Sequence, residues 1–389
     1  MKAGSIGSGY SLPLSEVATV KNSTGVLPLD LRDTAVLKAV GIVAIVLHNF
    51  YHKLPGTPRE NEFDFNPERF QHFLSSVAVP QQAFQSLLSA FGHLGVQLFI
   101  FLSAYGLAIK YWSIPESRSF VWSRIKKIYP TFFLALALWL ALKLMETRVI
   151  GFPSFLHKTG DDLVLTVLGV ISLVPGYDLP PVGPWWFLPF IVQFYCIWRG
   201  LAAFSRRFGL GGLAALSLAS VAILMLFEAP LNQRYAINLL ETPLGHLPEL
   251  CLGVAYARFG VRVGPVAALV ALGVFIAGNL SALLWPLTFV SALAIMLYGY
   301  SLTGGALRNR RSLEWVADVS MPVFFVNGFL RGPFLALAAR FDVWYVDLLL
   351  GFCVVLFSLA VGYVLLRVEG RLSARPFFRL RHLPGSGTS

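Results

Sequence analysis

Charged residues are scarce in this 389-residue sequence: they make up 13% of it, against about 25% in a typical soluble domain. Hydrophobic residues account for 56%. So few charges cannot cover a water-facing surface, which excludes a small soluble enzyme. The 32 Phe and 9 Trp residues exclude an intrinsically disordered chain, because such chains contain few aromatic residues.

Cysteine is rarer still, with three in the whole chain. Cys196, Cys251 and Cys353 stand inside apolar runs, far apart in the sequence, and none forms a CxxC pair. This spacing predicts neither a disulfide framework nor a zinc site. The first 30 residues contain no apolar run typical of a signal peptide, so we expect none to be cleaved.

Long apolar runs are what the sequence has in abundance. Runs of about 20 apolar residues between turn signals are typical of membrane-spanning helices, whereas a β-barrel shows alternating segments of about ten residues. The sequence therefore predicts an all-α fold, a polytopic transmembrane helical bundle. The apolar segments lie near 34–52, 92–112, 130–147, 161–174, 184–204, 210–228, 244–258, 263–279, 281–301, 317–339 and 345–366.

The number of crossings depends on segment 161–174, which is shorter than the roughly 17 residues that a span needs. If it does not cross, ten spans remain and both termini are cytoplasmic. Most of the 31 Lys and Arg residues then fall on the cytoplasmic side, as the positive-inside rule requires. We therefore expect ten spans, with 161–174 re-entrant or lying against the outer surface.

These spans divide the chain into a cytoplasmic N-terminal segment, a transmembrane domain and an Arg-rich cytoplasmic tail, at 1–33, 34–366 and 367–389. The net charge of +11 lies mainly in loops between spans, so it indicates membrane topology and not nucleic-acid binding. In the longest outer loop, about 53–91, apolar residues recur at near-helical spacing from Phe70 to Val77. This pattern predicts a helix lying on the membrane face.

Ionisable residues inside apolar spans are costly unless they are paired or face a cavity, so they often mark function. His48 is the clearest example, roughly 21 Å above the cytoplasmic start of its helix at a rise of about 1.5 Å per residue. His52 follows one turn later on the same face. An interfacial histidine bonded to a neighbour is one alternative. A metal-binding HxxxH pair is another, but no third ligand is evident, and we predict no metal site and no cofactor.

Two later spans place polar residues at a similar depth. Glu249 and His246 lie in the outer half of one span, and Asn327 and Arg331 lie one turn apart in another. We therefore expect these side chains to share an outer-half cavity with His48. The alternative is that Glu249 and Arg331 only pair with each other to lock two helices together.

A basic cluster precedes the span near 130–147. Arg124, Lys126 and Lys127 follow Phe120 in a segment that ends at Pro130. Such clusters are often plain topology signals. The alternative is that these side chains hold the phosphates of a cytoplasmic ligand.

The order of several motifs over about 34–330 resembles the acyltransferase-3 family, whose multi-pass membrane proteins acylate, and most often acetylate, extracytoplasmic glycans. The first span of the family carries a basic residue and a histidine with ten residues between them; Lys38 and His48 have nine. Ser103 is followed by Ala where the family has Ser-Gly, and Asn327 stands where a histidine is often found. The matching segments are 95–106, 120–130, 185–188 and 248–253.

The resemblance implies an O-acyltransferase that moves an acyl group, expected to be acetyl, from cytoplasmic acyl-CoA to a hydroxyl of an extracytoplasmic glycan or polysaccharide. A neutral imidazole can remove the hydroxyl proton during attack on a thioester, and positive groups can stabilise the oxyanion. We expect His48 to be the base and Glu249 to orient it. The other expected site residues are Lys38, Arg124, Lys126 and Lys127 for acyl-CoA, and Ser103, Trp186, Asn327 and Arg331 for the cavity and acceptor.

Two other functions fit the same polar residues. A transporter or flippase for a lipid-linked glycan would use the cavity without chemistry, and a structural subunit of a polysaccharide-assembly complex would use neither. We expect a multi-pass protein of the cell (inner) membrane. Its expected partners are acyl-CoA as co-substrate, a glycan or lipid-linked saccharide acceptor, membrane lipids and a polysaccharide-assembly complex, with no nucleic acid.

Overall fold

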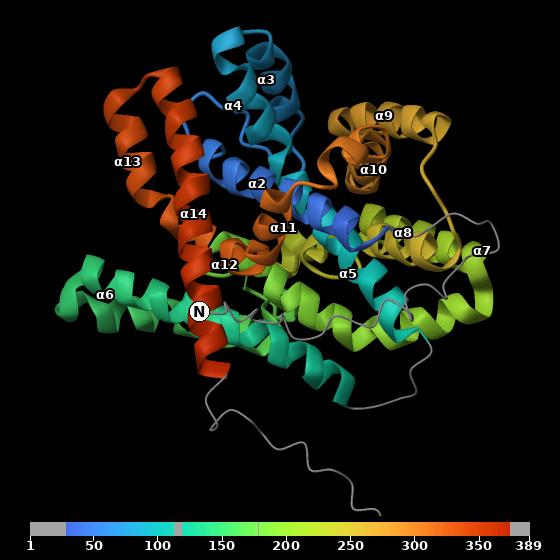
Figure 1. Cartoon of the computed structure of the whole chain (residues 1–389), viewed down its shortest axis with the longest axis horizontal. Helices are drawn as coiled ribbons and strands as arrows, with labels where there is room; N and C mark the ends of the chain where they lie inside the picture. The colour runs from blue at the N-terminus through green and yellow to red at the C-terminus, as the bar shows by residue number, and fades with distance from the viewer. Residues whose placement is uncertain (1–28, 113–118, 178, 374–389) are drawn as a thin grey trace, which may run out of the picture.

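The computed structural model describes residues 29–112, 119–177 and 179–373, and within these ranges it contains helices and no strand (Figure 1). The first 28 residues and the tail from 374 onward, where several of the expected cytoplasmic cations stand, lie outside the described residues. The α-helices are α2 (Leu31–Tyr51), α3 (Pro67–Val77), α4 (Pro80–Phe91), α5 (Gly95–Tyr111), α6 (Ser119–Leu168), α7 (Phe187–Tyr235), α8 (Leu247–Arg258), α9 (Pro265–Leu280), α10 (Leu287–Leu307), α11 (Arg311–Asp318), α12 (Ser320–Leu330), α13 (Gly332–Phe341) and α14 (Trp344–Ser373). Short 3-10 turns in the connections of the described chain are η1 (Gly92–Leu94), η2 (Ile171–Leu173), η3 (Gly183–Trp186) and η4 (Leu239–Glu241).

Among the described residues, six helical stretches are long and apolar enough to cross a membrane, which confirms a multi-pass helical membrane protein. They are Leu31–Tyr51, Pro80–Tyr111, Phe120–Leu168, Gly183–Tyr235, Leu287–Leu307 and Trp344–Leu372. The bent pair α11 and α12, at 68°, would make a seventh. The count of ten stays a prediction, because two expected spans form the short helices α8 and α9, of 12 and 16 residues.

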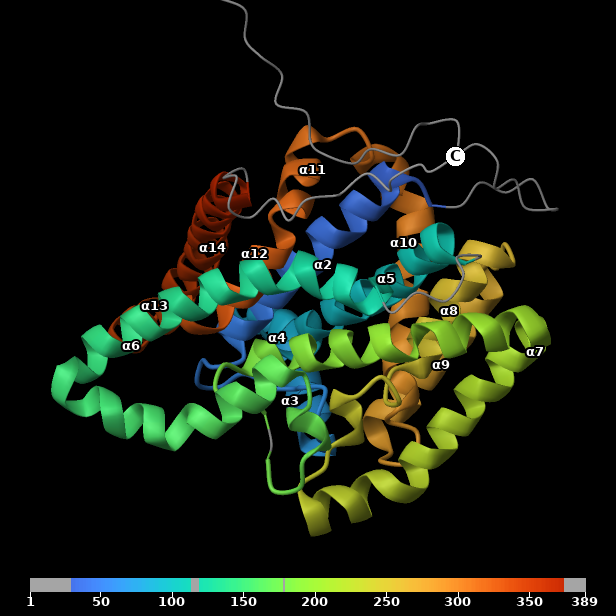
Figure 2. The same cartoon turned by 90° about the horizontal axis from the view of Figure 1, so that it is seen from below.

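Two of the long helices reverse direction at a break, and each break separates two of the expected apolar segments. In α6 the break is at Arg148, with a φ of 56° and a ψ of 171°. In α7 it is at Gly209, where glycine accommodates a φ of 60° without a steric cost. Figure 2 shows both helices as pairs of arms joined at a sharp bend.

Helix α2 lies at the centre of the bundle and packs against α4, α5, α11, α12 and α14 (Figures 1 and 2). It begins at a capping box, in which Asp30 accepts from the Asp33 amide and Asp33 accepts from the Asp30 amide. The guanidinium of Arg308 forms ion pairs with both carboxylates, and the Tyr300 hydroxyl donates to Asp33 over 2.7 Å. These bonds hold the first turn of α2 against the end of α10.

Glycines bring α2 into backbone contact with the η1–α5 segment. A Cβ at Gly95 would lie 2.6 Å from the carbonyl oxygen of Gly41, and one at Gly92 would lie 2.7 Å from both the Ala44 oxygen and the Cβ of His48. Such separations are too short for any side chain. Small residues allow close approach of this kind between membrane helices, where packing replaces the hydrophobic effect.

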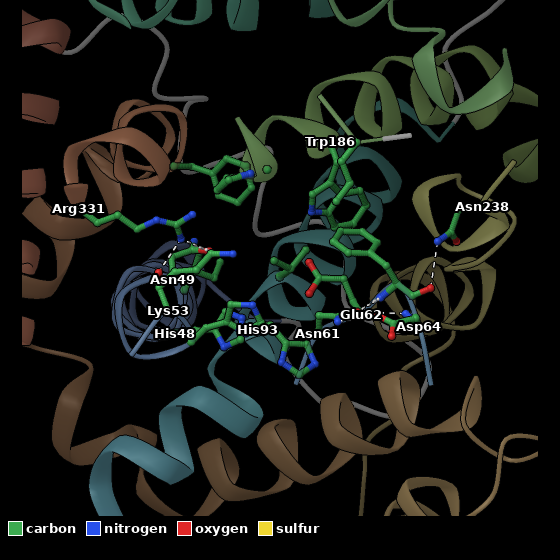
Figure 3. A pocket seen from close by; sticks show the side chains of 18 of the residues that line it. His48, Asn49, Lys53, Asn61, Glu62, Asp64, His93, Trp186, Asn238 and Arg331 are labelled. Carbon is green, nitrogen blue, oxygen red and sulfur yellow. Dashed lines mark hydrogen bonds between the residues drawn. The ribbon is translucent and has the colours of Figure 1, made fainter. Parts of the chain in front are cut away.

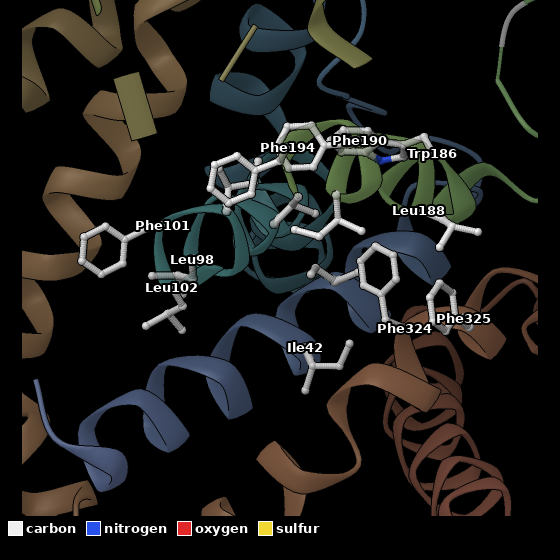
Figure 4. Close-up of a cluster of buried hydrophobic side chains, with 14 of the residues drawn as sticks. Ile42, Leu98, Phe101, Leu102, Trp186, Leu188, Phe190, Phe194, Phe324 and Phe325 are labelled. Atoms are coloured by element: carbon white, nitrogen blue, oxygen red, sulfur yellow. The ribbon is translucent and has the colours of Figure 1, made fainter. Parts of the chain in front are cut away.

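An apolar core fills the space between α2, α5, α7 and α12 (Figure 4). The buried indole of Trp185 donates to the carbonyl oxygen of Phe325 over 2.8 Å, which ties the start of α7 to α12. The labelled core side chains are Ile42, Leu98, Phe101, Leu102, Trp186, Leu188, Phe190, Phe194, Phe324 and Phe325. This core supports one wall of a polar cavity at the C-terminal end of α2.

Candidate active site

A cavity of about 380 Å³ lies between the end of α2, the 52–66 loop, η1, η3 and α12 (Figure 3). Side chains that carry nitrogen or oxygen make up most of its lining. They are His48, Asn49, His52, Lys53, Asn61, Glu62, Asp64, His93, Trp186, Asn232, Asn238 and Arg331. Such a concentration of polar groups among apolar helices marks the candidate site.

His48 is buried and its imidazole is fixed by one hydrogen bond. Its Nδ1 lies 3.1 Å from the carbonyl oxygen of Leu88 at the end of α4. A carbonyl oxygen only accepts, so Nδ1 carries the proton and donates it. In the neutral ring, Nε2 is then the unprotonated nitrogen, with a lone pair available to take a proton.

Two further histidines surround His48. The ring centroid of His52 lies 5.0 Å from that of His48, and the centroid of His93 lies 5.1 Å from it. Burial, with help from the cations Lys53 and Arg331, lowers the pKa of His52 to about 4, so this ring is neutral at pH 7. Over the described part of the chain, no set of three His, Cys, Asp or Glu side chains has an arrangement that could hold a metal ion.

A chain of hydrogen bonds joins α12 to the end of α2 beside His48. The Asn49 amide donates to Asn327 over 2.7 Å, and Arg331 donates to the Asn49 backbone oxygen over 2.5 Å. Asn327 donates in turn to the carbonyl oxygens of Val323 and Phe324. The structure therefore brings His48 and Arg331 to one cavity. Asn327 does not line this cavity but bonds Asn49, which does.

Glu249 is placed differently from the expected orienting role. Its buried carboxylate lies 3.9 Å from Nδ1 of His246, whose Nε2 donates to the carbonyl oxygen of Leu240 over 2.9 Å. Trp186 lines the cavity and stacks on His246, with centroids 5.8 Å apart, whereas Glu249 and His246 are not among the residues that line the cavity. Arg331 bonds Asn49 and forms no ion pair with Glu249, and the orienting partner of His48 is a backbone carbonyl.

The cavity contains a carboxylate that the sequence did not single out. Glu62, in the loop after α2, is 7% exposed, and burial raises its pKa to about 7 although Trp186 donates a hydrogen bond to it. Figure 3 shows this carboxylate between the α2 side chains and Asn238. Asn49 and His93 were also missed. The sequence signal for Glu62 was the dense polar run from Arg59 to Asp64 between two spans, and such a run cannot be told from a solvated loop by sequence alone.

Three of the four basic residues expected to hold acyl-CoA gather at the other end of α5. Arg124 donates to the Tyr111 hydroxyl, and its guanidinium lies 4.5 Å from the centre of that ring. The ammonium of Lys126 lies 5.2 Å from the centre of the Trp122 ring, and Arg124 is a neighbouring like charge of Lys127. Because α5 starts beside η1 and rises about 1.5 Å per residue, Tyr111 lies roughly 24 Å from the cavity end.

The two remaining expected site residues, Lys38 and Ser103, also lie outside the lining of the cavity. Lys38 is half-buried on α2, with Asp318 at the end of α11 as its neighbouring opposite charge. Ser103 donates to the carbonyl oxygen of Phe99 within α5 over 2.7 Å. The roles expected for both residues stay predictions.

A comparison with protein-family models matches residues 34–367 to the acyltransferase-3 model, described as an acyltransferase domain. No curated protein and no solved structure matches the chain. The match covers most of the sequence, including every helix that contributes to the cavity and to the basic cluster. The chain belongs to the acyltransferase-3 family and is a membrane acyltransferase.

Proposed function

We propose that the protein transfers an acyl group, in the first place acetyl, from cytoplasmic acyl-CoA to a hydroxyl of an extracytoplasmic glycan or lipid-linked saccharide at the inner membrane. The observation that carries the proposal is the bond from His48 Nδ1 to the Leu88 carbonyl oxygen, which leaves Nε2 free at a polar cavity. A base needs a free lone pair on one ring nitrogen and an anchor on the other; this bond anchors Nδ1 and fixes the tautomer in which Nε2 keeps its lone pair.

In the proposed reaction, His48 first accepts a proton and then donates it. Nε2 takes the proton of the acceptor hydroxyl while the oxygen forms a bond to the thioester carbonyl carbon. The carbon–sulfur bond then breaks, and the CoA thiolate takes the proton from the imidazolium. A two-step course through a transient acyl-His48 would use the same nitrogen as nucleophile. In either course, the nearby guanidinium of Arg331 favours the negative charge that develops on the carbonyl oxygen.

The basic cluster at the far end of α5 supports a donor that enters from the other side. Arg124, Lys126 and Lys127 offer cations for the CoA phosphates, and the aromatic rings under Arg124 and Lys126 hold two of them in place. We propose that the phosphates bind there while the thioester reaches the cavity. Acyl-CoA is then a co-substrate, and the mechanism uses no further cofactor.

The proposal is tested with the purified full chain in lipid nanodiscs. Acetyl-CoA is added with an extract of surface glycans, free thiol is followed with a colorimetric reagent, and acceptors are examined by mass spectrometry. We expect glycan-dependent thiol release and a mass increase of one acetyl group on the acceptor. Movement of a labelled lipid-linked glycan across proteoliposomes without thiol release would instead establish the flippase and end this proposal.

A further inference from the structure

A second cavity, of about 830 Å³, adjoins the first at the C-terminal end of α2. Both cavities are lined by His52, Lys53 and Asn61, so they adjoin each other; we call the cavity beside His48 the inner cavity and the second one the outer cavity. The walls of the second cavity come from the 52–66 loop and the start of α3. Apart from two prolines and a glycine, its lining side chains are polar or charged.

Three cations line these cavities without a carboxylate partner among the described residues. Lys53 and Arg59 face the outer cavity and Arg331 faces the inner one. Their recorded bonds are to neutral groups: Arg59 donates to the Leu54 backbone oxygen, and Arg331 donates to Asn49. Lys53 shares the lining of the inner cavity with Arg331 and that of the outer cavity with Arg59. Burial lowers the pKa of Lys53, and the like charges of Arg331 and Arg59 lower it further.

The acidic residues nearby do not neutralise these three cations. Asp64 and Glu60 pair with Arg69, over 2.8 Å and 3.5 Å. Glu62 is buried with a pKa raised to about 7, so at neutral pH it is only partly ionised. Glu68 lines the outer cavity but is exposed in the first turn of α3, where the helix dipole favours a negative charge.

Keeping like charges together around a cavity is unfavourable unless a ligand of opposite charge offsets their repulsion. Resting on the proposed function, we infer that the acceptor is an anionic saccharide, whose acidic group binds Lys53 and Arg59 while a neighbouring hydroxyl reaches His48. The acidic group is a carboxylate or a phosphate, since a guanidinium and an ammonium bind both. Arg331, deeper in the path, attracts the same acceptor toward the base.

Binding to matched oligosaccharides tests this inference apart from catalysis. The probes are cellotetraose, its counterpart oxidised to the uronate at C6, and its 6-phosphate, titrated calorimetrically into the full chain in nanodiscs. We expect an acidic probe to bind roughly tenfold or more tightly than cellotetraose, about 1.4 kcal/mol for each factor of ten. The better of the two acidic probes identifies the group. The advantage should shrink as added salt screens the charges.

Charge-removing variants locate the binding site. Lys53→Gln and Arg59→Gln should each weaken binding of the acidic probe and leave cellotetraose unchanged, whereas Lys158→Gln, an exposed cation on α6 away from both cavities, should change neither. Both variants replace exposed side chains, so little packing is lost. Equal binding of neutral and acidic probes, no binding of either acidic probe, or acidic binding that survives both substitutions overturns the inference.

The two proposals fail in different ways. His48→Asn should keep the preference for the acidic probe while losing transfer. Acidic binding without thiol release from acetyl-CoA by the unaltered chain would remove the proposed chemistry and leave the acceptor class in place. Thiol release that requires only a neutral glycan would support the proposed acyl transfer and overturn the inference of an anionic acceptor.

Discussion

The imidazole of His48 and the backbone of Leu88 are joined by a 3.1 Å hydrogen bond between α2 and α4, forty residues apart in sequence. The bond fixes the protonated nitrogen of the ring through a carbonyl group, which does not titrate. The proposed base therefore keeps the same tautomer whatever the ionisation of the carboxylates nearby. This arrangement makes His48 the first residue to test.

His48→Asn should abolish measurable acyl transfer. General-base catalysis contributes about 10²–10⁴-fold, and use of the ring as a nucleophile would make the loss larger. His157→Asn, at an exposed histidine of α6, is the control and should keep wild-type turnover. Initial rates of thiol release in nanodiscs provide the measurement. A folded His48→Asn protein that retains more than about a tenth of the turnover would falsify the mechanism, because it lies outside that range.

Gly92→Ala should displace the base without touching its chemistry. The new Cβ would lie 2.7 Å from the Cβ of His48 and from the Ala44 oxygen, so α2 or η1 has to shift. A misplacement of about 1 Å can cost roughly 10²-fold in rate. Gly106→Ala on α5 meets no atom within 4 Å and should leave the rate unchanged. Equal transfer rates for the two variants would show that the contact does not position His48.

Arg124→Ala should raise the KM for acyl-CoA with a smaller effect on kcat, since the proposed contact is to phosphate far from the reacting atoms. Arg124→Lys should recover little, because a lysine cannot reproduce a bidentate guanidinium contact. Arg207→Ala, an exposed arginine on α7, is a matched control. Steady-state kinetics over a range of acetyl-CoA concentrations separates the two constants. An unchanged KM in folded Arg124→Ala would leave the basic cluster as a topology signal.

Glu62→Gln should alter the pH dependence of stability. The pKa of Glu62 is about 7 in the fold, against 4.5 for an ordinary glutamate, so the folded state binds the extra proton between these values. Its contribution to stability is complete below pH 4.5 and is lost as pH rises through about 7. Glutamine mimics the neutral form, so the Tm of Glu62→Gln should fall less than that of the wild type between pH 5 and pH 8.5. Glu68→Gln, an exposed carboxylate, should follow the wild type; a parallel fall in all three proteins would contradict the prediction.

The ten-span topology is tested with reporter fusions. A reporter after Arg381 should be cytoplasmic, and one inserted at Gly176, in the turn that follows η2, should be extracytoplasmic. The second position decides whether segment 161–174 crosses. A cytoplasmic signal from Gly176 would invert every later loop and remove the ten-span arrangement.

The sequence predicted helices better than their breaks. Apolar runs locate α2, α5, α10 and α14, because length and apolarity suffice to mark a membrane-spanning helix. Arg148 gives no such signal, because its positive φ is uncommon for a non-glycine residue and depends on how the two arms of α6 pack.

The site was predictable where a polar residue stands out from its surroundings. His48 is conspicuous within an apolar helix, whereas Glu62 lies in a polar loop and is buried only by the tertiary fold. Glu249 has the expected depth, but depth along a helix does not give the direction of a side chain. The structure points it toward His246.

Helix α2 is held at both ends by different kinds of bond. At its start, Asp30 and Asp33 are tied to Arg308, and at its finish Asn49 is tied to Arg331. A rod fixed in this way resists turning about its own axis, since rotation would break charged contacts at one end and amide contacts at the other. In the proposed reaction the donor and the acceptor therefore come to an imidazole that is held in place, and the 52–66 loop is the segment beside α2 that lines the proposed acceptor path.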